Sequence, residues 1–205
     1  MSIPAFKPDP GYAGAFAEVL LRLAEMLGDA PGGKPVAICI AGGAALHIYT
    51  GARYTRDIDA KLFARAVIDP ARLRVPYRDK DDHTRFLYYD TQYNDTFALL
   101  HQDAYDDAIP VQVQGVDPKR LAVKLLTPLD LAVSKLARFS DQDREDIRIL
   151  AREGLLSASA LKARARAALP DYVGNLERIR NAIDMASRDV AGVRARAKSL
   201  PESKR

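Results

Sequence analysis

Two aspartates separated by one residue, Asp57 and Asp59, are the side chains of this sequence best suited to chemistry. Residues 57–63 alternate in character and predict a strand, on which positions i and i+2 project from the same face, about 6.5 to 7 Å apart at the backbone. Two carboxylates placed together repel each other unless a cation or a proton lies between them. Because Mg²⁺ and Mn²⁺ prefer oxygen ligands, the pair is a candidate metal site. The alternative is a strand end whose two solvated acids pair with Arg53 or Arg56.

A pair of glycines, Gly42 and Gly43, stands between a predicted strand (36–41) and a predicted short helix (44–49). Glycine lets the backbone approach a ligand closely, and the first N–H groups of a helix point toward an anion. The glycine pair is therefore a candidate phosphate cradle. A plain tight turn is the commoner explanation of two glycines after a strand.

The chain changes character at Thr127, where a capping hydroxyl, a proline at the first helical position and Asp130 at the third predict a helix start. On this helix Lys135 and Arg138 are three residues apart and occupy neighbouring positions of one face, where they could offset the charge of a triphosphate. The alternative is a surface lysine at the margin of the helix, and in either case we expect its replacement to leave stability almost unchanged. Asp143 and Asp146 fall in the first turn of the next predicted helix, where the helix dipole alone favours acids.

The pattern of apolar residues and turn signals predicts an α+β fold, in which a small mixed sheet flanked by helices is followed by a helical C-terminal part. We predict two domains, a core of residues 1–127 and a helical region of residues 128–205 with a basic tail. The predicted strands and helices are, in order, helix 12–27, strand 36–41, helix 44–49, strand 57–63, a hairpin of 85–92 with 96–103, strands 109–116 and 121–126, and helices 128–139, 144–153, 158–168 and 171–193.

The bulk composition is that of an ordinary globular protein. Of 205 residues, 48% are hydrophobic and 28% are charged, which argues against disorder. The net charge of +4 tolerates a polyanionic partner such as a nucleotide or RNA without requiring one. No apolar run approaches the roughly 20 residues that cross a bilayer, and the N-terminus lacks a secretion signal. With the single cysteine, Cys39, in an apolar run, these features predict a cytoplasmic protein with no membrane partner.

The glycine pair, the short helix and the segment Arg53-Tyr-Thr55-Arg56-Asp57-Ile-Asp59 together resemble the signature of the DNA polymerase β-like nucleotidyltransferase superfamily. Within it, the chain looks most like AbiEii-type and related uncharacterised, toxin-like bacterial nucleotidyltransferases. A second block, residues 121–150, resembles the helical motif of the same families. The positions that match that motif are Asp130, Lys135, Arg138, Asp143 and Asp146.

The resemblance implies an enzyme that moves a nucleoside monophosphate from a nucleoside triphosphate to an acceptor hydroxyl on an RNA or tRNA end, a protein or a small molecule. It implies that Asp57 and Asp59 hold Mg²⁺ or Mn²⁺, and that Lys135 assists catalysis. The nucleotide-binding residues would be Gly42, Gly43, Thr55, Arg56, Arg138, Asp143 and Asp146.

Members of the superfamily usually offer a third carboxylate from a neighbouring strand. Asp103, at the end of the segment 96–103, is the first candidate in this sequence, and Asp90 is the second. The biological role that the resemblance implies is a toxin of a toxin–antitoxin or phage-defence system, with a cognate antitoxin as partner. The alternative is a noncatalytic relative that binds a nucleotide or a partner protein.

Overall fold

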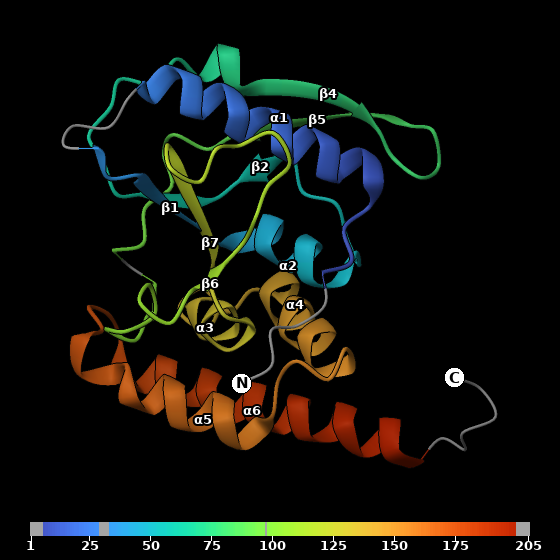
Figure 1. Ribbon diagram of the computed structural model, residues 1–205. Helices are drawn as coiled ribbons and strands as arrows, with labels where there is room; N and C mark the ends of the chain where they lie inside the picture. The colour runs from blue at the N-terminus through green and yellow to red at the C-terminus, as the bar shows by residue number, and fades with distance from the viewer. Residues whose placement is uncertain (1–5, 29–32, 97, 200–205) are drawn as a thin grey trace. The chain divides into compact units, whose positions relative to one another are not determined.

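The computed structural model describes residues 6–28, 33–96 and 98–199 (Figure 1). Helices and two small sheets alternate in the N-terminal part, and helices alone form the C-terminal part, so the structure confirms the predicted α+β class. The chain divides into two compact units, the first made of Met1–Asn94 and Asp107–Leu126, the second of Asp95–Asp106 and Thr127–Arg205. The domain division into residues 1–127 and 128–205 stays a prediction.

The first unit contains two sheets. The four-stranded sheet has the order β3-β1-β7-β6, with β1 and β7 parallel and the outer two strands antiparallel to their neighbours. The three-stranded sheet has the order β2-β5-β4, with β2 parallel and β4 antiparallel to β5. The elements of this unit are α1 (Pro10–Leu27), β1 (Val36–Ile40), α2 (Gly42–Thr50), β2 (Asp57–Ile58), β3 (Ala60–Leu62), a 3₁₀ turn (Pro70–Leu73), β4 (Arg74–Arg78), β5 (Thr84–Tyr89), β6 (Ile109–Pro110) and β7 (Leu121–Leu125).

Local signals account for the first helix and its packing. The Asp9 side chain accepts a hydrogen bond from the backbone N–H of Tyr12, and Pro10 occupies the first turn, so α1 begins as capping chemistry predicts. Its buried face, which includes Phe16 and Leu20, packs against the hairpin of β4 and β5 (Figure 1). This helix therefore covers one face of the three-stranded sheet.

The predicted hairpin of residues 85–92 with 96–103 is wrong. The strand β5 pairs instead with β4, which precedes it, and Asp95–Asp106 belongs to the second unit and contains no strand among its described residues. The turn between β4 and β5 is closed by the Asp79 side chain, which accepts hydrogen bonds from the backbone N–H groups of Asp81 and His83, each at 2.9 Å. Asp82, with φ of 60°, takes the left-handed conformation that glycine supplies in most short hairpin turns.

Two other predicted strands are shorter than expected. The predicted strand 57–63 is two strands, β2 and β3, which belong to different sheets and meet at Asp59. Of the predicted strand 109–116, only Ile109–Pro110 pairs, as β6. Proline has no N–H to donate, which limits pairing there to an edge position.

The second unit contains α3 (Pro128–Ser134), α4 (Asp141–Arg152), α5 (Ala158–Ala167), a 3₁₀ turn (Leu169–Asp171) and α6 (Leu176–Ser199). These match the four predicted helices with different ends. The predicted helix 128–139 ends at Ser134, and the chain reverses through Phe139, whose φ is 49°. The next helix begins earlier than predicted because Ser140 caps it, with Asp143 completing a capping box. Within the described residues, none of these helices or those of the first unit combines the length and apolar character that a membrane span needs.

One buried hydrogen bond fixes α2 to the four-stranded sheet. The hydroxyl of Tyr49 donates to the carbonyl of Leu126 at 2.8 Å, and both groups are buried. We expect Tyr49→Phe to lower the free energy of unfolding by about 1–3 kcal/mol, because the carbonyl loses its donor in a place that water does not reach. Tyr88→Phe, at an exposed ring on β5, is the matched control and should leave the denaturant midpoint unchanged. Equal midpoints for the parent and Tyr49→Phe would contradict the role of this bond.

Candidate active site in the first unit and a charged cluster in the second

The two aspartates of the candidate site lie where the chain passes from one sheet to the other. Asp57 belongs to β2, which pairs with β5, and Asp59 lies between β2 and β3, with its carbonyl accepting the N–H of Ala41 at 2.8 Å. Ile58 and Ala60 are buried, whereas both aspartates are half-buried. The chain thus turns its apolar side chains inward and both carboxylates toward solvent.

The glycine pair lies directly against this acidic segment. Gly42 has φ of 55°, and a Cβ there would come within 1.8 Å of Asp59 Oδ2. A Cβ at Gly43 would come within 2.9 Å of the Thr55 side chain and 3.2 Å of the Arg53 guanidinium. Only glycine satisfies both the left-handed backbone and the close approach at position 42. The structure therefore brings together five predicted site residues, Gly42, Gly43, Thr55, Asp57 and Asp59.

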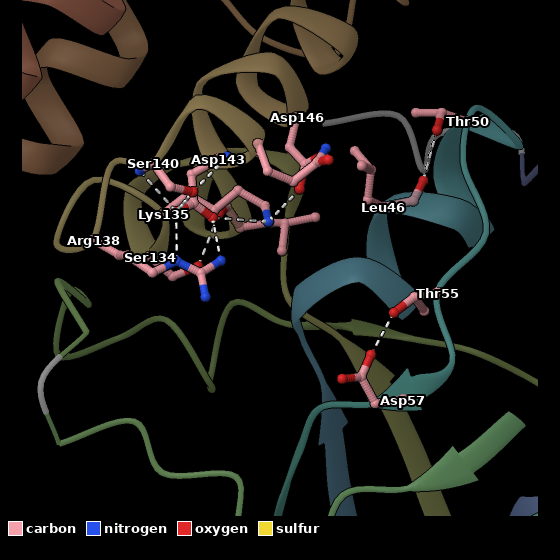
Figure 2. Close-up of polar contacts among 12 residues, drawn as sticks. Leu46, Thr50, Thr55, Asp57, Ser134, Lys135, Arg138, Ser140, Asp143 and Asp146 are labelled. Carbon is pink, nitrogen blue, oxygen red and sulfur yellow. Dashed lines mark hydrogen bonds and ion pairs between the residues drawn. The ribbon is translucent and has the colours of Figure 1, made fainter.

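The hydroxyl of Thr55 donates a hydrogen bond to Asp57 Oδ1 (Figure 2). The bond holds one oxygen of Asp57 in place. Thr55 therefore joins the acidic pair to the glycine pair, since its side chain also borders Gly43. Arg56, the next residue, is exposed and lines a pocket described below.

The start of α2 is shaped for an anion. The N-cap residue, Ala41, makes no side-chain capping bond, and the N–H of Ala45 donates to the Ala41 carbonyl at 3.1 Å. The N–H groups of the first turn, which include those of Gly42 and Gly43, therefore lack an acceptor within the helix. Such a turn attracts a phosphate through its N–H groups and through the helix dipole.

Asp90 is the carboxylate that the strand pairing sets beside the acidic pair. Asp57 is in register with Tyr88 and Ile58 with Tyr89, and the N–H of Asp90, directly beyond the last pair, donates to the Ile58 carbonyl at 3.1 Å. Oδ1 of Asp90 accepts the N–H of Gln92 at 2.8 Å. Residues in register on neighbouring strands project from the same face. Asp103, the first candidate from the sequence, lies in a turn of the second unit, with its carboxylate 3.6 Å from His101, and its role stays a prediction.

A second group of possible metal ligands lies at the tip of the β4–β5 hairpin. Asp79, Asp81 and His83 each offer one ligand atom within 4.8 Å of the others, an arrangement consistent with a divalent metal. Both oxygens of Asp79 already accept hydrogen bonds, one from two backbone N–H groups and the other from Arg85. Burial raises the pKa of Asp79, but these donors outweigh it and lower the pKa to about 2. Its carboxylate is therefore committed to closing the turn.

Four predicted residues of the helical part, Lys135, Arg138, Asp143 and Asp146, form a charged cluster (Figure 2). Lys135 Nζ lies 2.6 Å from Asp146 Oδ2 and 3.8 Å from Asp143 Oδ1. The side chains of Lys135, Asp143 and Asp146 are at most 6% exposed. Arg138 holds Asp143 through two bonds of 2.7 Å, but its own side chain is 75% exposed.

The charges within this cluster balance. Two cations face two carboxylates, so Lys135 already has its counter-charges inside the second unit. Burial raises the pKa of Asp143, but the bonds from Arg138 and Ser140 and the charge of Lys135 outweigh it and hold that pKa below its usual value. The cluster therefore stabilises the fold above the ordinary carboxyl pKa, and this contribution is lost as the pH falls through the lowered pKa of Asp143. The predicted role of Lys135 at the phosphates stays a prediction.

Asp130 also has a structural partner that the sequence did not indicate. Its carboxylate accepts hydrogen bonds from Arg164 at 2.7 and 3.1 Å and from the Thr127 hydroxyl at 2.7 Å. This ion pair joins α3 to α5. Arg164 is one of two arginines in its helix, the other being Arg166, so no local signal distinguishes it before the helices are packed.

The contact between Gly42 and Asp59 predicts a stability difference between two glycine substitutions. Gly115 also has a positive φ, of 79°, but a Cβ there meets nothing within 4 Å. Gly115→Ala should therefore lower the free energy of unfolding only through the cost of placing alanine in a left-handed backbone conformation, about 1–2 kcal/mol. Gly42→Ala should lose at least about 1 kcal/mol more, because Asp59 must move. Equal losses in urea denaturation would contradict the close approach.

The buried cluster revises the expectation that Lys135 can be replaced without loss of stability. Lys135→Met should lower the free energy of unfolding by about 3–5 kcal/mol, because it leaves Asp146 buried without its cation. The double variant Lys135→Met with Asp146→Leu should recover most of that loss. The control is Lys162→Met, whose partner Asp184 lies at 2.7 Å on the surface, and which should lose less than about 1 kcal/mol. Similar losses for the two lysines would show that the Lys135 pair is not buried in solution.

Comparison with known proteins gives the family of the chain. Residues 18–187 match the model of one protein family, described as a nucleotidyltransferase of unknown function (DUF6036). No curated protein and no solved structure matches the chain. The matched region includes the glycine pair, the acidic pair and the whole charged cluster. The chain therefore belongs to this family of nucleotidyltransferases of unknown function.

Proposed function

We propose that the acidic site of the first unit catalyses metal-dependent transfer of a nucleoside monophosphate from a nucleoside triphosphate to an acceptor hydroxyl. The observation that carries this proposal is the contact of Asp59 with Gly42 at the start of α2, together with Thr55, which borders Gly43 and donates a hydrogen bond to Asp57. Carboxylates suited to a cation and N–H groups suited to a phosphate then lie side by side. A metal-bound triphosphate presents that same combination of charges.

The residues of this site fit a divalent cation. Asp57, Asp59 and Asp90 offer only oxygen ligands, which is the set that Mg²⁺ and Mn²⁺ take. The half-buried positions of these residues leave their carboxylates partly open to solvent. When bound, the ion neutralises charge on the triphosphate and orients it for in-line displacement. We favour this site over the hairpin group, in which the carboxylate of Asp79 is already engaged.

Residues of this site act on both the attacking hydroxyl and the triphosphate. The acceptor oxygen attacks the α-phosphorus and forms a new P–O bond, while the bond between the α-phosphorus and the bridging oxygen breaks. Pyrophosphate leaves, and the hydroxyl proton passes to a carboxylate of the acidic site. The N–H groups of Gly42 and Gly43 hold phosphate oxygens, and Thr55 keeps Asp57 oriented.

The remaining assignments rest on the family resemblance. They are a nucleotide-binding role for Arg56, Arg138, Asp143 and Asp146, a catalytic role for Lys135, and a physiological role as a toxin with a cognate antitoxin. An RNA or tRNA end is one of the acceptors this reaction can use, beside a protein or small-molecule hydroxyl. A cytoplasmic location fits the use of nucleoside triphosphates.

Substitution of the acidic residues tests the proposal. The parent protein, incubated with Mg²⁺ or Mn²⁺, α-labelled nucleoside triphosphates and total RNA, should transfer label and release pyrophosphate. Asp57→Asn, Asp59→Asn and Asp90→Asn should each reduce the rate by about a hundredfold or more, as the loss of single electrostatic stabilisers does. Their melting temperatures without metal should not fall, because each change removes one of several crowded negative charges.

Asp103→Asn is the matched control that separates the two candidates for the third carboxylate. If Asp90 completes the site, Asp103→Asn keeps the parental rate. Loss of transfer in Asp103→Asn alone would assign the third carboxylate to Asp103. Binding of nucleotide by the parent protein, without transfer to any acceptor, would favour a noncatalytic relative.

A further inference from the structure

The three-stranded sheet has one face that α1 covers and one face that carries exposed aromatic rings. On β5, Leu87 and Tyr89 are buried, while Phe86 and Tyr88 are 39% and 37% exposed. On β4, the exposed positions in register with these rings are Pro76 and Arg74. Two large rings therefore stand in a row on the open face, about 6.5 to 7 Å apart at the backbone.

A pocket of about 690 Å³ includes these rings. It combines aromatic and basic side chains, and none of the residues that line it is an aspartate or a glutamate. Those that could contact a ligand with bases and phosphates are Tyr54, Arg56, Arg74, Arg85, Phe86 and Tyr88. The Arg74 guanidinium lies 4.1 Å from the centre of the Phe86 ring, and that of Arg85 lies 4.6 Å from the centre of the Tyr54 ring. The Arg74 guanidinium therefore shares the open face with Phe86 and Tyr88, whereas Arg85, in register with Tyr77, belongs to the other face of the hairpin.

The strand register connects this pocket to the acidic site. Asp57 is in register with Tyr88, and Tyr88 is in register with Arg74, so these residues form a row across β2, β5 and β4. Residues in such a row project from one face of the sheet. Thr55, which donates to Asp57, also lines the pocket. The acidic pair does not line the pocket, but Asp57 adjoins it through Thr55 and Tyr88.

Rings and arginines in this arrangement favour a strand of nucleic acid. Every base has a flat face that stacks on an aromatic ring, and arginine attracts the backbone phosphates, so binding of this kind requires unpaired bases. A row of two rings on one strand fits successive bases of a chain, whereas a nucleoside triphosphate has one base. The glycine pair and the start of α2 already offer a place for the triphosphate.

We propose that the open face of the three-stranded sheet binds the unpaired end of a single nucleic-acid strand, with successive bases stacked on Phe86 and Tyr88 and with Arg56 and Arg74 facing the backbone phosphates. This inference extends the proposed function and rests on it in one respect: the terminal hydroxyl of the bound strand is the acceptor at the acidic site. The binding itself needs neither metal nor nucleotide.

Direct binding tests the proposal separately from catalysis. Fluorescence anisotropy is measured with labelled single-stranded RNA and DNA of one sequence, with EDTA present and without nucleoside triphosphate. Phe86→Ala and Tyr88→Ala should each weaken binding by about 5- to 150-fold, which corresponds to about 1–3 kcal/mol per stacked base. Phe63→Ala, at a ring that is 49% exposed and does not line the pocket, should leave binding unchanged. Tyr88→Phe, which keeps the ring, should bind like the parent.

The salt dependence provides a second readout. Arg74→Gln should reduce the slope of log affinity against log salt by about one if this arginine neutralises a phosphate. Arg65→Gln, at an exposed arginine that does not line the pocket, should keep the parental slope. Circular dichroism melts of each variant establish that the hairpin is intact.

The outcomes distinguish this inference from the proposed function. Asp57→Asn with Asp59→Asn should lose transfer and keep strand binding. We call the open face with Phe86 and Tyr88 the platform. Strand binding that depends on both rings, in a protein without transferase activity, would support the platform and contradict the proposed function. Transfer to a protein or a small molecule, with no strand binding by the parent, would defeat the platform alone. Three results would each overturn the platform. The first is unchanged strand binding in both ring variants, and the second is equal affinity for duplex and single strand. The third is that the ring variants lose binding of nucleoside triphosphate and not of the strand.

Discussion

The contact between Gly42 and the carboxylate of Asp59 is the constraint on which the acidic site depends. It requires a residue without a side chain, in a left-handed conformation, at the point where β1 passes into α2. Because Asp59 also ends β2 and leads into β3, the same contact fixes where the chain leaves one sheet and enters the other. The N–H groups that we propose for phosphate binding and the carboxylates that we propose for metal binding are thus placed side by side by this one contact. A larger side chain at position 42 would separate them.

The charged cluster of the second unit depends on the pairing of buried opposite charges. Lys135, Asp143 and Asp146 are removed from water and are stabilised only because each meets an opposite charge. Ending α3 at Ser134 turns Lys135 inward, and the Ser140 cap places Asp143 in the first turn of α4. Arg138 is the member of the cluster that is largely exposed, so it is the cation best placed to contact an incoming anion. A loss of activity in a Lys135 variant has therefore to be separated from a loss of stability.

Local patterns in the sequence predicted the parts of the fold that local chemistry determines. The apolar run 36–41, the glycine pair and the capping chemistry at Thr127 each specify their own element, and the structure has β1, α2 and α3 there. The hairpin of β4 and β5 was not predicted because strand pairing is a tertiary property; β4 also contains Pro76. The edge position of β4 accepts that proline, since no neighbour needs its N–H. Asp103 was the first candidate for the third carboxylate because residues 96–103 were predicted to form the neighbouring strand, whereas the strand that pairs with β2 is β5, which Asp90 follows.

The central claim is that the acidic pair beside Gly42 holds the metal. It is tested most directly by titrating Mn²⁺ into isotope-labelled protein and recording the paramagnetic broadening of assigned amide signals. We predict selective broadening at Gly42, Asp57, Asp59 and Asp90, strengthened by a nucleoside triphosphate and absent in Asp57→Asn with Asp59→Asn. Broadening confined to Asp79, Asp81 and His83, or identical in the parent and that double variant, would contradict the account.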